Sequence, residues 1–239
     1  MADKLYNEAS IQAIADAIRA KSGKADTMKV SEMAGEIAEL GSYTAVDFFD
    51  YTKPEGAIVF EQTTLPADSL YFAKRSNITS IFGVNYNETA NRNNTFRGMT
   101  GLRYAVFPKW TRMYNTVFFE CTNLEAIDWL GGGTGGSLMW GFCYKLKKMV
   151  IRKSGGISAL GSTNAFNSTP FANGGSGGTI YIPKVLYDEL GTGSSLDYKA
   201  ATNWSTYDAY GTITWAQIEG SIYETQYVDG TPIETGGDS

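Results

Sequence analysis

Three stretches of the sequence decide the fold: FRGMTGLRYAVFP at 96–108, FFECTNLEAIDWL at 118–130 and WGFCYKLKKMVIR at 140–152. Written under one another, they share four apolar columns with a period of 22 residues. The columns hold an aromatic ring, a methionine or thiol, a leucine and an apolar strand residue: Phe96, Phe118 and Trp140; Met99, Cys121 and Cys143; Leu102, Leu124 and Leu146; Ala105, Ile127 and Met149. Four columns with one period indicate a structural repeat.

The repeat continues in weaker form on both sides. NITSIFG at 77–83 has the same leucine-to-strand spacing, 24 residues upstream, and residues 162–183 form a degenerate copy with Gly/Ser insertions and a closing IYIP. A 22-residue unit cannot bury its own apolar residues, so successive coils must stack and bury the columns as ladders. We therefore predict a mainly β solenoid over residues 42–183, with repeats near 96–117, 118–139, 140–161 and 162–183.

Two other segments flank this solenoid. Residues 1–41 contain two amphipathic patterns that predict an α-helical hairpin, too small to bury both apolar stripes alone. The hairpin is predicted either to attach to another chain or a copy of itself, or to fold back on the C-terminal domain. Residues 184–239 are predicted to form a small α/β cap with helical or turn-like segments and a last strand or two. The predicted assembly interface consists of the stripe residues Ile11, Ile14, Ile18, Met33, Ile37 and Leu40.

Composition excludes several functional classes. The net charge is −5 with a pI of about 4.9 and no basic tract anywhere, which argues against nucleic-acid or anionic-membrane binding. The chain has no histidine, the commonest general base and metal ligand. No apolar run is long enough to span a membrane, and the opening residues lack signal-peptide features. We expect the protein to be made and kept in the cytoplasm, or to be exported by a route other than a signal peptide, for example in a particle freed by lysis.

The pattern of an aromatic, Cys, Leu and an apolar strand at three-residue steps resembles the BspA-like leucine-rich repeat of bacterial surface and phage proteins. IYIPKVLYDEL and DYKAATNWSTYDAYGTI look like the C-terminal cap of that family. The opening IQAIADAIRAKSGKADTMKVSEMAGEIAEL is similar to an N-terminal helical module of tail, baseplate and fibre proteins from phages and prophages of Firmicutes. The sequence departs from the family pattern at Met99, Trp140 and Arg152.

This resemblance implies a non-enzymatic phage virion structural protein of the tail, fibre or decoration type, located in the virion. It implies a homo-oligomer that contacts other virion proteins through the helical hairpin and presents the solenoid to a host receptor or a neighbouring subunit. One alternative is a BspA-type adhesin on the bacterial cell surface, and another is a carbohydrate-binding or depolymerising protein. No cofactor is implied.

Neither cysteine predicts catalysis or a metal site. There is no C-x-x-C pair and no histidine, so one chain cannot complete a four-ligand zinc site from nitrogen and sulfur donors. Because Met99 fills the same column, Cys121 and Cys143 are predicted to be small buried hydrophobes, although a disulfide between adjacent coils stays open. The carboxylates Glu120 and Glu125, together with Asp128, provide no evident acid/base pair.

Aromatic and polar residues outside the columns predict a binding surface. The segment KWTRMY and the asparagine-rich loop before it combine aromatic rings with adaptable polar side chains, as receptor-binding loops do. We expect them to bind a host surface glycan or protein, or else to pack on the solenoid or a neighbouring subunit. The predicted site consists of Tyr86, Asn87, Asn91, Arg92, Trp110, Arg112 and Tyr114.

Overall fold

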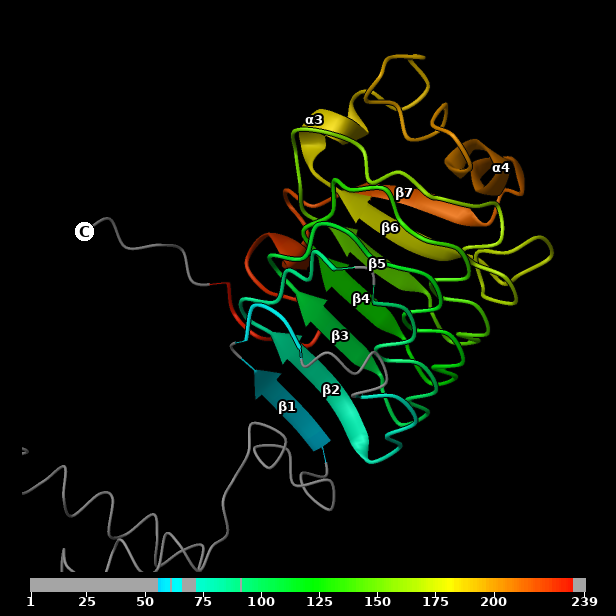
Figure 1. Ribbon diagram of the computed structural model, residues 1–239. Helices are drawn as coiled ribbons and strands as arrows, with labels where there is room; N and C mark the ends of the chain where they lie inside the picture. Colours follow the sequence, from blue (N-terminus) through cyan, green and yellow to red (C-terminus); the bar gives the residue numbers. More distant parts are fainter. Residues whose placement is uncertain (1–55, 61, 66–71, 91, 234–239) are drawn as a thin grey trace, which may run out of the picture. The chain divides into compact units, whose positions relative to one another are not determined.

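The computed structural model describes residues 56–60, 62–65, 72–90 and 92–233 (Figure 1). The chain divides into two units, residues 1–53 and 54–239, and only the second contains described residues. The predicted helical hairpin and its assembly interface therefore lie outside the described residues: Ile11, Ile14, Ile18, Met33, Ile37 and Leu40.

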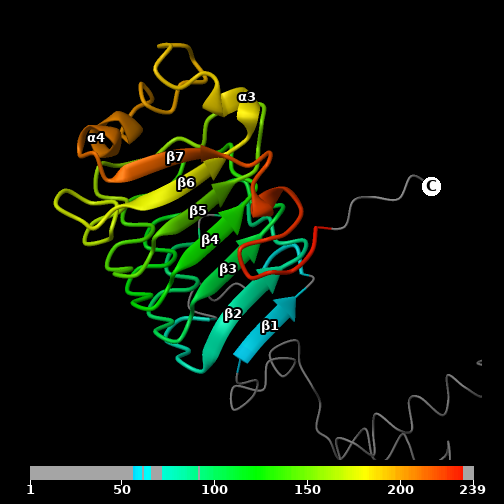
Figure 2. The same ribbon diagram turned by 180° about the vertical axis from the view of Figure 1, so that it is seen from behind.

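The described residues form a seven-stranded parallel sheet in which the strands lie in chain order (Figures 1 and 2). A parallel sheet in strict chain order arises when each coil adds one strand beside the preceding one. The fold is therefore mainly β and solenoid-like, as predicted. The strands are β1 (Gly56–Phe60), β2 (Ile78–Gly83), β3 (Tyr104–Phe107), β4 (Ala126–Trp129), β5 (Lys148–Ile151), β6 (Gly178–Ile182) and β7 (Ile213–Gln217).

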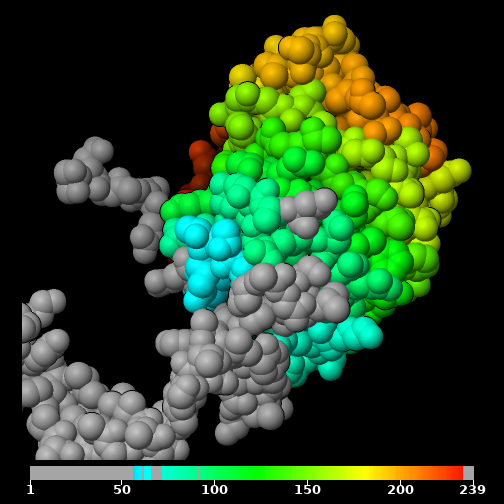
Figure 3. Space-filling model, in the orientation of Figure 1, coloured from blue at the N-terminus to red at the C-terminus, as the bar shows by residue number. Residues whose placement is uncertain are grey.

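Strand register reproduces the predicted columns. Ala105 pairs with Ile127 and Ile127 with Met149, and the column continues to Ile81 on β2 and Ile180 on β6. All twelve residues of the four predicted columns are at most 1% exposed. Figure 3 shows the successive coils as bands of changing colour along the described part of the molecule.

The aromatic column forms a stack of rings inside the coils. Phe96 lies parallel to Phe118 with ring centroids 5.1 Å apart, and Trp140 stacks on Phe166 at 4.7 Å. Phe72 extends the stack on the other side, 5.4 Å from Phe96. Aromatic rings bury more apolar area per residue than other side chains, so this stack makes a large contribution to the core.

Both thiols face the backbone of the preceding coil. Cys121 Sγ donates to the carbonyl of Phe96 at 3.0 Å, and Cys143 Sγ donates to the carbonyl of Phe118 at 3.1 Å. The two cysteines are free and buried, so the structure contains no disulfide between them. Burial raises the pKa of the Cys143 thiol, which disfavours the reactive thiolate.

Each coil turns at a residue with left-handed backbone geometry. One such corner recurs from coil to coil and is occupied by different residue types: Lys74, Gly98, Glu120, Phe142 and Ser168. Backbone bonds to the next coil fix this corner, since Glu120 N donates to Gly141 O at 2.9 Å and Phe142 N to Asn167 O at 2.8 Å. Phe142, with φ of 61°, is a bulky residue in a region that such residues rarely adopt.

Residues after β6 cover the last coil, in agreement with the predicted helical or turn-like segments. They contain α3 (Lys184–Tyr187) and α4 (Trp204–Ala209), followed by β7. The buried Trp204 donates its indole N–H to Ser158 O at 2.6 Å, and the buried Tyr207 donates its hydroxyl to Thr163 O at 2.5 Å. These hydrogen bonds tie the cap to the irregular segment after β5.

The segment after β7, residues 218–233, is called the strap here. It contains a 3₁₀ turn (Ile222–Glu224) where a second strand was one expectation, and it runs back across the outer face of the sheet (Figure 2). Its Tyr223 packs on Tyr181, and its Tyr227 contacts Phe82 with ring centroids 5.1 Å apart. The strap thus covers outward-facing side chains from β6 back to β2.

Candidate functional site

The aromatic rings of the predicted binding surface are buried, which favours the alternative that this segment packs on the solenoid. Tyr86 and Trp110 are 0% exposed and Tyr114 is 6% exposed. Trp110 packs edge-on against Tyr86 at 4.8 Å and against Phe107 at 5.0 Å. Trp110 lies just after β3, where the chain turns inward, and its ring also contacts Phe96 and Phe118 of the aromatic column.

The polar residues of that surface are also largely engaged within the protein. Asn87 Oδ1 accepts from the backbone N–H and the hydroxyl of Thr111 at 3.3 and 3.1 Å. Tyr114 donates its hydroxyl to the carbonyl of Thr89 at 2.6 Å. These contacts agree with the alternative that the loop packs on the solenoid.

A buried ion pair holds the same loop from within. Glu88 is 2% exposed, and its carboxylate accepts from the guanidinium of Arg92 at 2.5 Å. Arg112 is exposed and lies over the Tyr114 ring at 5.0 Å, and Asn91 lies outside the described residues. Among the predicted binding residues that the structure describes, Arg112 alone is fully on the surface.

The three carboxylates considered as candidate acids each contact an arginine from an adjacent coil. Glu120 pairs with Arg97 at 3.2 Å and Glu125 with Arg103 at 3.0 Å. Asp128 is fully buried and accepts two hydrogen bonds from Arg152, at 2.6 and 2.5 Å. These carboxylates therefore act as inter-coil or strap contacts.

Arg152 anchors the strap over Asp128. Besides the carboxylate, its guanidinium donates to the carbonyl of Tyr223 at 2.9 Å and to that of Gln226 at 3.2 Å, and it lies over the Tyr227 ring at 4.8 Å. Burial raises the pKa of Asp128 to about 6, although the hydrogen bonds and charge of Arg152 lower it.

An open pocket of about 500 Å³ lies beside the last regular coil and is called the tyrosine pocket here. Among the described residues, its lining contains no charged side chain. Two tyrosines at its rim are exposed, Tyr144 by 57% and Tyr210 by 38%. Amides and hydroxyls supply the rest of its hydrogen-bonding capacity, chiefly from Asn164, Asn167, Ser168 and Asn173.

The tyrosine pocket forms where the repeat loses its period. Phe166 continues the aromatic column but follows Trp140 by 26 residues instead of 22. A Gly/Ser-rich segment inserted after Phe166 lengthens this coil further. The extra residues form part of the pocket wall. Tyr144 lies at the rim because it follows the buried Cys143 and points outward. Tyr210 reaches the rim from the C-terminal end of α4.

Neither tyrosine was identified from the sequence, because neither belongs to a column. The break in the 22-residue period between Trp140 and Phe166 was the sequence signal that could have indicated the tyrosine pocket. The structure thus moves the candidate site from the loop around Tyr86 to the coil around Tyr144.

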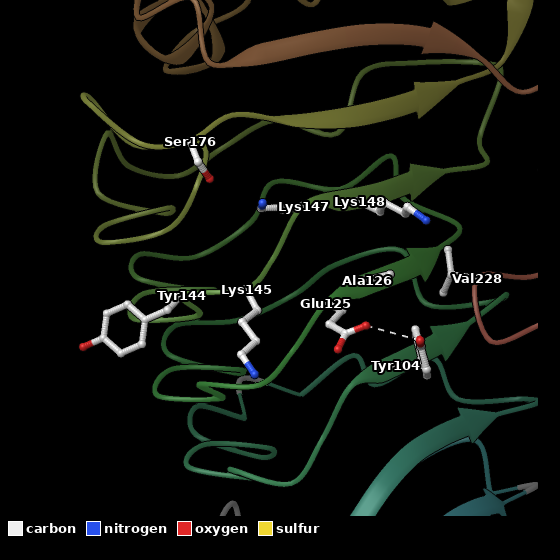
Figure 4. A pocket seen from close by; sticks show the side chains of 9 residues that line it. All are labelled: Tyr104, Glu125, Ala126, Tyr144, Lys145, Lys147, Lys148, Ser176 and Val228. Carbon is white, nitrogen blue, oxygen red and sulfur yellow. Dashed lines mark hydrogen bonds between the residues drawn. The ribbon is translucent and has the colours of Figure 1, made fainter.

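A second hollow, of about 540 Å³, lies on the outer face of the sheet and is called the lysine pocket here (Figure 4). It contains Lys145, Lys147 and Lys148, all exposed, and one carboxylate, Glu125. Tyr144 lines both pockets. The two pockets therefore meet at one aromatic side chain.

Within the described part of the chain, no three His, Cys, Asp or Glu side chains gather in a way that could hold a metal ion. In that same part no helix has the length and apolar character needed to cross a membrane.

No protein-family model matches the chain, and searches of curated proteins and of solved structures found no match. The lining of the two pockets therefore provides the evidence for function.

Proposed function

We propose that this protein is a non-enzymatic binding protein of a phage or prophage virion, of the tail, fibre or decoration type. Its solenoid, of the BspA-like leucine-rich-repeat type, holds a host-surface glycan in the tyrosine pocket. The observation that carries the glycan assignment is the lining of that pocket, with two exposed tyrosine rings among amides and hydroxyls and no charged side chain.

The lining matches the chemistry of a saccharide. A sugar ring has an apolar C–H face, which packs on a flat aromatic ring, and a rim of hydroxyls that both donate and accept hydrogen bonds. The amides of Asn164, Asn167 and Asn173 offer both donors and acceptors. A volume of about 500 Å³ falls within the roughly 300–1,000 Å³ typical of small-molecule sites.

A rigid scaffold favours such a site. The pocket walls are loops between stacked coils, and the stacked columns below them are fully buried. Loops on a rigid frame can hold aromatic and polar groups in fixed positions at little entropic cost on binding. The virion assignment rests on the resemblance of the N-terminal segment to phage tail and fibre modules, with the predicted hairpin at 1–41 as the attachment part.

The glycan assignment is tested on an array of bacterial surface polysaccharides probed with labelled protein. The variants Tyr144→Ala and Tyr210→Ala are compared with Tyr187→Ala, which removes a tyrosine of similar exposure, 37%, from α3 outside the pocket. Each pocket variant is expected to bind at least about tenfold more weakly, and the control within about twofold. Retention of no polysaccharide, or equal binding by all variants, rejects the pocket as a glycan site.

Two further measurements test the rest of the proposal. Mass spectrometry of purified particles should find the protein at a fixed copy number, whereas its presence on uninfected cells and absence from particles would favour the adhesin. Release of reducing sugar from a retained polysaccharide would overturn the non-enzymatic assignment.

A further inference from the structure

We propose that the glycan is anionic, and that the lysine pocket binds a phosphate or carboxylate group on the same chain whose sugar occupies the tyrosine pocket. This inference rests on the proposed function, because it names the class of glycan.

The lysine pocket is a hollow built into the strand register. On the outer face of the sheet Tyr104 pairs with Ala126, and Ala126 pairs with Lys148. The small side chain of Ala126 leaves space between its two longer neighbours. Figure 4 shows the lysines between Tyr144 at one end and Tyr104 and Val228 of the strap at the other.

The charges in this hollow are unbalanced. Its one carboxylate, Glu125, accepts from Arg103 Nε at 3.0 Å and from Arg103 Nη2 at 3.2 Å. The hydrogen bonds to Arg103 lower the pKa of Glu125, so the carboxylate stays ionised and its charge is balanced by that arginine. Lys145 adds a weaker electrostatic contribution of the same sign.

The ion pairs of the described residues leave these lysines out. Among the described residues, none of Lys145, Lys147 and Lys148 forms an ion pair. Lys147 continues the surface column of Arg103 and Glu125, and the next coil places Gly178, which has no side chain, after it. The pocket therefore presents three ammonium groups to solvent in a chain whose net charge is −5.

Continuity between the pockets links the two chemistries. Because Tyr144 lines both, a sugar packed on its ring leaves the adjoining part of the same polymer beside the lysines. A glycan with phosphodiester or carboxylate groups supplies both an apolar sugar face and the negative charge. A nucleic acid is less well matched, since it requires a basic stripe along its backbone rather than three lysines in one hollow.

The test measures binding by titration calorimetry with four soluble probes at low and high salt. The probes are a glycosylated poly(glycerol phosphate), polygalacturonate, neutral dextran and oligodeoxythymidylate. The triple variant Lys145→Gln/Lys147→Gln/Lys148→Gln is compared with Lys109→Gln/Lys184→Gln/Lys199→Gln, which removes the same charge from exposed lysines outside the pocket.

At least one anionic glycan is expected to bind to the unaltered protein with an affinity that falls with salt. The pocket triple variant should bind it at least about tenfold more weakly and with less salt dependence, and the control within about twofold. The poly(glycerol phosphate) and polygalacturonate arms distinguish phosphate from carboxylate.

Other outcomes separate this inference from the proposed function. If Tyr144→Ala and Tyr210→Ala abolish binding while the lysine triple variant binds like its control, the anionic subsite is overturned and the glycan pocket stands. If only the lysine variant loses binding, the tyrosine pocket fails and the anionic site stands. Dextran binding as tight as that of either anionic glycan, or tightest binding of oligodeoxythymidylate, overturns the anionic-glycan inference.

Discussion

Two surfaces of this solenoid have a similar composition but differ in how far their side chains are buried. Around Tyr86 and Tyr114 the aromatic rings are buried and the asparagines form hydrogen bonds to neighbouring coils, whereas around Tyr144 similar residues line an open pocket. In the closed surface the asparagines follow the 22-residue period: Asn93 Oδ1 accepts from Asn115 N, and Asn115 Oδ1 accepts from Ser137 N. Where inserted residues break the period, the polar side chains line a cavity. A binding surface and an inter-coil contact therefore cannot be distinguished by composition alone.

The largest expected effect is the loss of a buried ring from the closed surface. Trp110→Ala should lower the free energy of unfolding by about 3–5 kcal/mol, because Trp110 is fully buried and its ring contacts Tyr86 and Phe107. Urea unfolding monitored by circular dichroism measures the change. A loss below about 1 kcal/mol would mean that the Trp110 ring is not packed in the core.

Asp128 on β4 is buried beneath the strap, and its carboxyl group gives the stability of the fold a pH dependence. Burial raises the pKa of Asp128 to about 6 from an ordinary 3.8, so the folded state binds this proton more tightly than the unfolded chain does. The resulting stabilisation is fully present below about pH 4 and is lost as the pH rises through about 6. The difference between a pKa of 3.8 and one of about 6 limits this contribution to about 3 kcal/mol.

Urea unfolding between pH 4 and 7.5 tests this contribution. Asp128→Asn should remove that part of the pH dependence, whereas the exposed Asp188→Asn on α3 should retain it. An Asp128→Asn variant with the same pH profile as the unaltered protein would exclude Asp128 as the titrating group.

A smaller effect is expected at a single hydroxyl of the closed surface. Tyr114→Phe keeps the buried ring but removes the hydrogen bond to the carbonyl of Thr89, 2.6 Å away. The free energy of unfolding should fall by about 1 kcal/mol. Tyr144→Phe, measured in the same way, is the matched control on the open surface and should change stability negligibly.

The core could be predicted from the repeat, whereas interactions outside the repeat could not. Phe96, Cys121 and Leu146 could be assigned to the interior because their residue types recur every 22 positions. The role of Arg152 depends on its contact with Tyr223, 71 residues further along the chain. No local periodicity reports a contact of that kind.

The candidate site was missed for a related reason. Trp110 and Tyr144 both stand outside the four columns, so the sequence offers the same evidence for each. Their burial differs because Trp110 follows a strand end and turns inward, whereas Tyr144 follows the buried Cys143 and turns outward. Only the three-dimensional arrangement of coils separates them.

The smallest expected effect on stability is that of truncating an exposed ring on the open surface. Tyr144→Ala should change the free energy of unfolding by at most about 0.5 kcal/mol, because the side chain is 57% exposed and its ring contact with Phe142 is a distant 6.1 Å. Tyr114→Ala, the same substitution on the closed surface, should cost several-fold more, since its ring is buried and its hydroxyl is bonded. Equal losses from the two substitutions would show that Tyr144 is a packing residue, and the pocket beside it would then lose its claim to be a binding site.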